Sequence, residues 1–295
     1  MFAEFVFTPT ESKYLIAKAI AGTDRVQKAL RDGIIAIHPS TTGFALFHTL
    51  TGRRNAGKVW VTGMIVEKGL CIERNTQIAK KDREEGKGIG NALADPGLYP
   101  HTMVLYKGRE MSGWTINELA DRMGPGDIYV KGVNAIDISG KVGVLLGSLV
   151  EGTIGKMLAA REKKGFEILC PVGYEKLIPV PVETAAAFIS QTKDYSMGQK
   201  VRMRPLDATV VTEVDALKML SGVEEAVLFA AGGVGGGEGS VCLAVSGTEE
   251  QIRRAIESAE SVKGIQFPEI HSPVCMDCVH PTCHLAGQRK AWTVE

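Results

Sequence analysis

Two turns of the sequence combine hydroxyl groups with glycine directly before an expected helix. The members of the first turn, which follows a short apolar run at residues 34–37, are Ser40, Thr41, Thr42 and Gly43. The second turn contains Gly152 and Thr153, at the start of a segment with helical spacing that reaches residue 164. Unpaired amide hydrogens and the helix dipole both attract anions, so these turns are candidate sites for a phosphate or carboxylate. Simple capping of the two helices also explains hydroxyl groups at these positions.

A polar loop between two apolar runs carries the candidate catalytic groups. The runs at residues 128–130 and 167–172 flank this loop and the expected helix, which predicts a βαβ crossover with parallel strands. Open parallel sheets bind ligands at the carboxyl ends of their strands, where this loop begins. We therefore expect Lys131 and Asn134 to contact a ligand, and Asp137 and Glu151 to be the candidate acid/base residues.

The C-terminal tail, HSPVCMDCVHPTCH, has the spacing of a metal site. Cys275 and Cys278 are separated by two residues, and Cys283 follows shortly after. Three thiolates and one imidazole complete the tetrahedron that Zn²⁺ prefers, with His280 as the expected fourth ligand and His271 as the alternative. The expected role is structural, because a bound metal fixes a tail that lacks a core of its own. A reduced, metal-free tail is the other interpretation.

The elements that position these residues predict an α/β fold. Strands alternate with helices from residue 34 to 173, which favours a mostly parallel sheet. After residue 200, strands expected at 208–212, 225–231, 241–246 and 265–267 and two intervening helices follow the βαββαβ order of a ferredoxin-like α+β domain. Residues 232–239 contain six glycines and are expected to form a flexible hairpin tip. The predicted domains are residues 1–200 and 201–270, followed by the metal-binding tail 271–295.

Composition narrows the classes of partner and compartment. The chain has 34 basic and 34 acidic residues, so no net positive charge favours nucleic acid or an anionic membrane. No basic and apolar leader begins the sequence, and no apolar run is long enough to span a membrane. Lone cysteines beside one clustered set are typical of a reducing compartment, so we expect a cytoplasmic protein. A homo-oligomer is left open.

Residues 34–173 resemble the superfamily of ribose-5-phosphate isomerase, glucosamine-6-phosphate deaminase, CoA transferases and the effector domains of DeoR-type repressors. The segment IAIHPSTTGFALFHTL resembles the hydroxyl-rich phosphate loop of that group. The segments TMVLYKGREM and INELADRMGPGDIYVKGVNAID are similar to the DeoR-type run of strand, helix and strand. The stretch from residue 133 to 173 is also similar to methylthioribose-1-phosphate isomerases and initiation-factor-2B subunits. The resemblance implies a sugar-phosphate-binding α/β domain, and a small ferredoxin-like lid as in the ribose-5-phosphate isomerases.

The sequence departs from these families at the positions of their catalytic residues. Lys131 and Asn134 stand where the resemblance implies aspartates, and only Asp137 remains acidic. An amide cannot act as a general base, so the isomerase mechanism is not carried over intact. Glu151 and Gly152 match the catalytic glutamate of one class of CoA transferases, without the surrounding Ser-Glu-Asn-Gly pattern.

These observations predict a protein that binds a small anionic metabolite, a phosphorylated sugar or nucleotide-like compound, in a sensing or regulatory role. One alternative is a sugar-phosphate isomerase or group transferase with rearranged acid/base residues. A second alternative is a structural or assembly protein. The sequence leaves open whether the protein is an enzyme, and it predicts no organic cofactor.

Overall fold

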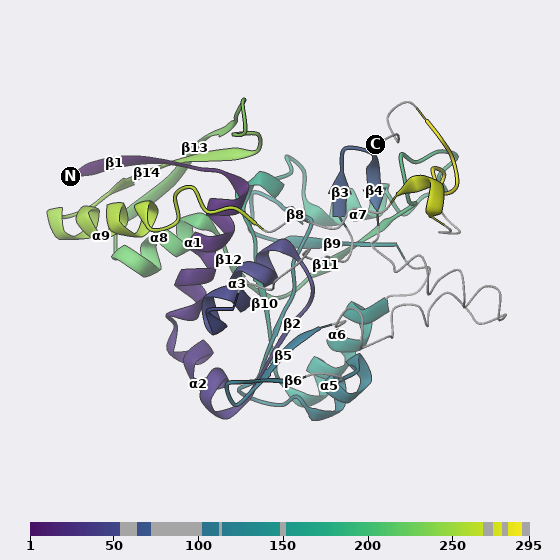
Figure 1. The fold of residues 1–295 in the computed structure, drawn as a ribbon, viewed down its shortest axis with the longest axis horizontal. Helices are drawn as coiled ribbons and strands as arrows, with labels where there is room; N and C mark the ends of the chain where they lie inside the picture. The colour runs from purple at the N-terminus through teal and green to yellow at the C-terminus, as the bar shows by residue number, and fades with distance from the viewer. Residues whose placement is uncertain are drawn as a thin grey trace.

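The protein is a mixed α/β molecule whose largest element is a six-stranded mixed sheet, as a computed structural model shows (Figure 1). The structure describes residues 1–53, 64–71, 102–111, 114–147, 152–267, 274–278 and 283–290. The expected α/β class is therefore confirmed.

The central sheet has the order β12-β10-β7-β2-β5-β6. Its strands are β2 (Ile34–Ile37), β5 (Met103–Tyr106), β6 (Arg109–Met111), β7 (Ile128–Val130), β10 (Glu167–Pro171) and β12 (Thr209–Val211). The first four strands of that order run parallel, whereas β5 and β6 pair antiparallel. The predicted βαβ crossover is confirmed, because β7 and β10 are parallel neighbours and α6 (Gly152–Lys164) connects them.

Helices cover both faces of this sheet, and alternate strand residues feed two separate cores. On one face Ile35, Ile37 and Leu169 pack with α1 (Pro9–Ala21), α2 (Asp24–Asp32) and α3 (Thr41–Thr51). On the other face Tyr129 and Cys170 pack with α5 (Ile116–Arg122) and α6. The period of two in the strands sends successive side chains to opposite faces, which explains the division. In Figure 1 the two sets of helices flank the sheet, with α1 and α2 to its left and α5 and α6 to its right.

Part of the loop expected between β7 and α6 is a hairpin instead. Strands β8 (Ala135–Ile136) and β9 (Val142–Leu146) pair antiparallel, and β11 (Arg202–Leu206) adds a third strand. The hairpin turn requires positive φ at Gly140 (83°) and is held by the carboxylate of Asp137. The three strands form a second small sheet that α7 (Val182–Phe188) contacts.

The region after residue 200 differs from the expected ferredoxin-like unit in two elements. The strand expected at 208–212 is β12, which joins the central sheet beside β10, and residues 265–267 do not form a strand. The hairpin of β13 (Glu225–Gly232) and β14 (Ser240–Ser246) is completed by β1 (Phe2–Phe7) from the N-terminus. Strands more than 200 residues apart in the chain thus pair directly. Single-sequence periodicity carries no information about such pairing.

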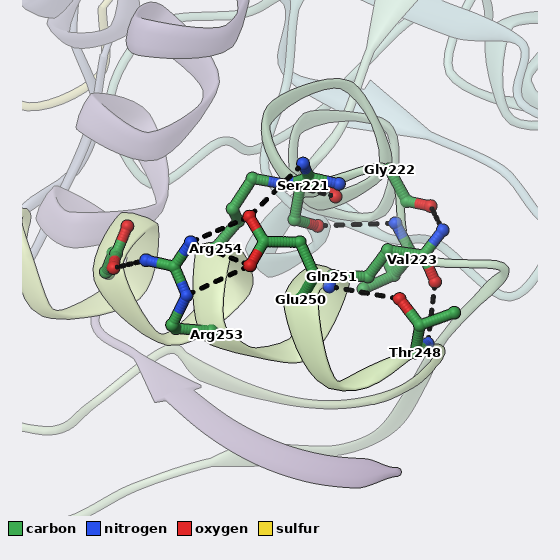
Figure 2. Close-up of polar contacts among 9 residues, drawn as sticks. Ser221, Gly222, Val223, Thr248, Glu250, Gln251, Arg253 and Arg254 are labelled. Carbon is green, nitrogen blue, oxygen red and sulfur yellow. Dashed lines mark hydrogen bonds and ion pairs between the residues drawn. The ribbon is translucent and has the colours of Figure 1, made fainter.

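Helices α8 (Glu213–Ser221) and α9 (Glu249–Glu260) are tied together at the end of α8, as Figure 2 shows. The side chain of Gln251 donates to the carbonyl of Gly222 at 2.6 Å, and Arg254 Nε donates to the carbonyl of Ser221 at 3.0 Å. Both carbonyls would lack partners at a free helix end. These bonds fix α8, whose first residue, Glu213, lies at the edge of the central sheet.

Candidate anion-binding site

The carboxyl ends of the four parallel strands bring polar residues to one edge of the central sheet. Main-chain bonds extend the ladders past the strands, from His38 N to Val130 O (2.9 Å) and from Lys131 N to Leu169 O (2.9 Å). The residues that follow the strands are His38 and Ser40 after β2, Lys131 after β7, Tyr174, Glu175 and Lys176 after β10, and Glu213 after β12. Ligands bind at such an edge in open α/β sheets.

Ser40 and Lys131, two of the sequence-predicted ligand contacts, come from neighbouring strands at this edge. Ser40 is the N-cap of α3, and its Oγ accepts a hydrogen bond from Gly43 N at 2.9 Å. The same hydroxyl lies against Gly132, because a Cβ on that glycine would come within 2.5 Å of Ser40 Oγ. The cap of α3 is thus adjacent to the residue that follows Lys131.

The other residues of the first predicted turn pack closely. A Cβ on Gly43 would lie 2.8 Å from both His38 O and a methyl group of Ile37, so glycine is required for α3 to approach β2. Thr42 is fully buried, and its hydroxyl has no hydrogen-bond partner in the described part of the chain. Thr41 is half-buried at the first position of α3.

Lys131 is a buried cation at the centre of this edge, with 7% of its surface exposed. Burial lowers the pKa of Lys131 to about 8; the Cys170 thiol opposes this change and the neighbouring Lys176 ammonium adds to it. Among the described residues no carboxylate forms an ion pair with Lys131. The structure therefore brings two ammonium groups into one electrostatic neighbourhood.

A cluster of acidic and basic side chains lies beside Lys131. Lys13 Nζ of α1 is 3.0 Å from Glu175 Oε1, and Lys176 Nζ is 4.0 Å from the same oxygen. A Cβ on Gly173 would lie 1.9 Å from Glu175 Oε2 and 2.8 Å from Glu213 Oε1, so the two carboxylates converge over that glycine. Opposite charges and a carboxylate pair thus share this part of the edge.

Glu213 is fully buried and accepts the main-chain N–H of Tyr174 with both carboxylate oxygens, at 3.1 and 3.0 Å. Burial raises the pKa of Glu213 to about 7, and the charge of Glu175 adds to this effect, while the hydrogen bonds from Tyr174 N oppose it. Glu213 and Lys131 therefore both titrate within about a unit of neutral pH.

The glycine-rich segment joins β13 to β14, as the sequence predicts for a hairpin tip. Its last glycine is close to the acidic cluster, since a Cβ on Gly239 would lie 3.1 Å from Pro9 and 3.9 Å from Glu175. The hairpin tip therefore borders the candidate site.

The second predicted turn is only partly described. Gly152 and Thr153 begin α6 and are half-buried, whereas Glu151 lies outside the described residues. Ile154, the next residue, packs in the core on the face of the sheet opposite to α3. No hydrogen bond between described residues links this turn to Ser40 or its neighbours.

Asp137 and Asn134, predicted to be catalytic and ligand-contacting, have structural partners in the β8–β9 hairpin. Asp137 is 2% exposed and accepts hydrogen bonds from Ser139 Oγ (2.6 Å), Val182 N (2.9 Å) and the main chain of Ser139 and Lys141. Burial alone would raise its pKa, but these bonds lower the pKa to about 2. A carboxylate held in this way is a poor base near neutral pH.

Asn134 Oδ1 accepts the N–H of Leu145 at 3.0 Å, and Asn134 N donates to Gly143 O at 2.8 Å. Both bonds join the two strands of the hairpin. The amide thus fixes the path of the chain after Lys131.

The predicted metal ligands Cys275, Cys278 and Cys283 are all described, whereas His280 and His271 lie outside the described residues. None of the three thiols is in a disulfide. Within the described ranges, no three His, Cys, Asp or Glu side chains are already arranged to hold a metal ion.

Sequence reasoning missed Lys13, Glu175, Lys176 and Glu213. Lys131 is a candidate because it follows the carboxyl end of a parallel strand, where ligands bind in such sheets. The same reasoning applies to the ends of β10 and β12, which are followed by Glu175, Lys176 and Glu213. Lys13 has a weaker signal, as a charged residue directly before the buried run of Tyr14, Leu15 and Ile16.

None of the described helices combines the length and apolar character that a membrane crossing needs. The chain matches no model of a protein family, and no curated protein matches it.

Proposed function

We propose that the protein binds a small anionic metabolite at the carboxyl edge of the central sheet. The observation that carries the proposal is the buried ammonium of Lys131, next to the Ser40 cap of α3 and without a carboxylate partner among the described residues. A buried charge is costly unless an opposite charge or hydrogen bonds compensate it. An anionic group between Lys131 and the N-terminus of α3 supplies that compensation.

The charges of the edge favour a ligand with one anionic end and a neutral polar body. Lys131 and Lys176 repel each other, so an anion between them relieves the repulsion. The carboxylates of Glu175 and Glu213 lie close by and can accept hydrogen bonds from ligand hydroxyls. A phosphorylated sugar or a nucleotide-like compound has both features, and a sensing or regulatory role needs no further chemistry.

Calorimetry with inorganic phosphate, ribose 5-phosphate, glucosamine 6-phosphate and AMP tests the proposal, with ribose as the uncharged control. We expect a phosphorylated compound to bind near pH 7 and ribose not to bind. Because only the ammonium form attracts the anion, the affinity should fall as the pH rises through about 8.

The variants Lys131→Met and Ser40→Ala should weaken binding, whereas Lys28→Met, at an exposed position of α2, should not. No heat with any of the phosphorylated compounds, or equal affinity of the wild type and Lys131→Met, contradicts the proposal.

A second candidate function is an enzyme, a sugar-phosphate isomerase or group transferase. The specific observation in its favour is that Lys131 and Glu213, at the same sheet edge, have pKa values of about 8 and 7. Groups that titrate near neutral pH are suited to general acid/base work. In this version Glu213 replaces the sequence-predicted Asp137 and Glu151 as the base.

Exchange of substrate carbon-bound protons in deuterated water, followed by NMR, tests the enzyme hypothesis. Loss of exchange in Glu213→Gln, with binding retained, supports it. Absence of exchange in the wild type with every sugar phosphate that binds excludes an isomerase.

We also infer kinship with the sugar-phosphate isomerase, CoA-transferase and DeoR effector-domain superfamily for residues 34–173. The parallel strands β2, β7 and β10 and the hydroxyl-bearing turn after β2 support this kinship. The ferredoxin-like unit is proposed in a modified form, in which β1 lies beside β14. The domain limits 1–200, 201–270 and 271–295 stay predictions.

A further inference from the structure

The hairpin of β3 (Met64–Val66) and β4 (Gly69–Cys71) is docked on a distant segment of the chain. Leu70 N donates to Met197 O at 2.8 Å, and Gln199 N donates to Leu70 O at 2.8 Å. These two bonds pair β4 in parallel with residues 197–199. Cys71 is the residue directly after this paired position.

The same segment, residues 196–199, binds the C-terminal tail on its other side. Gln199 forms an antiparallel bridge with Cys283, and His284 N donates to Gly198 O at 3.1 Å. Ser196 N donates to His284 Nδ1 at 3.0 Å. Residues 196–199 therefore lie between β4 and the tail, and Figure 1 shows the β3–β4 hairpin and the yellow tail at the same end of the molecule.

Glycines make the docking of β4 unusually close. A Cβ on Gly69 would lie 2.3 Å from Met197 O, and a Cβ on Gly198 would lie 2.2 Å from Leu70 O. Both glycines have positive φ, at 130° and 94°. Any other residue at either position would clash with the main chain of the opposite segment, so the sequence favours this contact specifically.

The first two tail cysteines form a compact turn. A short 3-10 helix, Cys275–Asp277, is closed by a bond from Cys278 N to Cys275 O at 3.2 Å. Gly287 N donates to the same carbonyl at 2.8 Å, which folds the end of the tail back onto the turn. Cys275 is buried in this turn.

Cys71 and the three tail cysteines belong to segments that meet at residues 196–199. The pKa of Cys71 is raised to about 11, mainly by burial, with contributions from Cys275, Cys283 and Cys278, while Lys68 opposes the rise. The main-chain pairing points the same way, because Leu70, next to Cys71, pairs with Gly198, and Cys283 pairs with the following residue, Gln199. The remaining cysteines, Cys170 and Cys242, are not among the groups that affect the pKa of Cys71.

We propose that Cys71, Cys275, Cys278 and Cys283 together form a tetrathiolate zinc site, with Cys71 rather than His280 as the fourth ligand. Four thiolates at about 2.3 Å in a tetrahedron are a standard structural zinc site. Because the side chains are not yet arranged around a common centre, binding draws the four sulfur atoms inward. Each thiol that ligates the ion as thiolate releases its proton to solvent.

The metal would join three segments that otherwise meet through a few main-chain bonds. It would fix the tail and the β3–β4 hairpin on either side of residues 196–199. The side chain of Gln199 also donates to Gly147 O at 2.5 Å, shortly before α6 begins. The zinc site thereby supports the chain at the point where it approaches the second predicted turn.

Elemental analysis and cobalt(II) substitution of the full-length protein test the proposal. We expect about one zinc per chain. The cobalt form should show sulfur-to-metal charge-transfer absorption of the strength given by four thiolates. A cobalt spectrum typical of three thiolates and one nitrogen, or the presence of iron in place of zinc, overturns the proposal. Both measurements use the wild-type protein.

Competition with a chelator compares Cys71→Ser, His280→Asn and the control Cys242→Ser, a half-buried cysteine on β14. Loss of a residue that only supports a ligand costs 10- to 100-fold in affinity, so loss of Cys71 should cost more than about 100-fold. His280→Asn and Cys242→Ser should retain the wild-type affinity. Wild-type affinity of Cys71→Ser, or loss of zinc in His280→Asn, contradicts the proposal.

Discussion

Replacement of Lys131 by methionine should stabilise the protein and at the same time abolish anion binding. Methionine keeps most of the length and the apolar stem of lysine but removes the ammonium group. Lys131 is 7% exposed and has no ion pair with a described carboxylate, so its charge is a cost in the folded state without ligand. A residue that lowers stability in this way is typical of a functional site.

The size of the effect follows from the pKa of Lys131. A fall from the ordinary value of 10.5 to about 8 means that the folded state holds the proton less tightly than the unfolded state. At about 1.4 kcal/mol for each tenfold change, the charged side chain costs about 3 kcal/mol near pH 7. Stability of the wild type should rise between about pH 8 and 10.5, because the unfolded state binds more protons there. The advantage of Lys131→Met should therefore shrink to about 1 kcal/mol near pH 10.

Urea unfolding at both pH values, in buffer without phosphate or sulfate, measures the difference in free energy of unfolding. Lys28→Met, at an exposed position of α2, is the matched control and should differ little from the wild type at either pH. A Lys131→Met protein that is less stable than the wild type near pH 7, or whose difference does not change with pH, refutes the reasoning.

Three further substitutions have definite expected outcomes. The wild type should lose stability as the pH rises from about 4.5 to 7, because the folded state retains the Glu213 proton more tightly than the unfolded state. Glu213→Gln should not show this loss, and thermal unfolding across that pH range measures the difference. Asp137→Asn should lower the free energy of unfolding by about 2 kcal/mol near pH 7, and leave anion affinity per folded molecule unchanged; a loss of affinity would restore Asp137 as a site residue. Gly198→Ala should weaken zinc retention and expose the tail to protease, because the new Cβ would clash with Leu70. The control Gly126→Ala should do neither, since Gly126 has a similar φ of 92° but open space around it. Equal behaviour of the two variants would show that the close approach to Leu70 is unimportant.

Local periodicity was sufficient to predict the elements around the site. The short apolar runs of β2, β7 and β10 and the helical spacing of α6 are properties of neighbouring residues, so the parallel crossover could be read from them. The sequence predicts a loop where the β8–β9 hairpin lies, because its strands are short and the polar Asp137 accepts hydrogen bonds within the hairpin turn. The pairing of β1 with β14 depends on tertiary packing between chain ends, which no local pattern encodes.

The candidate site was predictable to the extent that it depends on strand ends. Ser40 and Lys131 follow predicted strands, and the structure places them at adjacent ends of β2 and β7. Asp137 is near Lys131 in sequence, but the hairpin directs its carboxylate to main-chain donors instead. Cys71 is about 200 residues from the tail cysteines, and only the docking of β4 brings it near them.

The pairing of charges at the sheet edge distinguishes a binding site from an ion cluster that only supports the fold. A supporting cluster would place a buried ammonium against a buried carboxylate, which reduces the cost of both. Here Glu175 pairs with Lys13, and Glu213 accepts the N–H of Tyr174, so neither acid is used to compensate Lys131. The charged or titratable neighbours that influence the pKa of Lys131 are the Cys170 thiol and the ammonium of Lys176, and neither is a carboxylate. A buried ammonium group without a described carboxylate partner, close to the N-terminus of α3, is the arrangement expected where the missing negative charge arrives with a ligand.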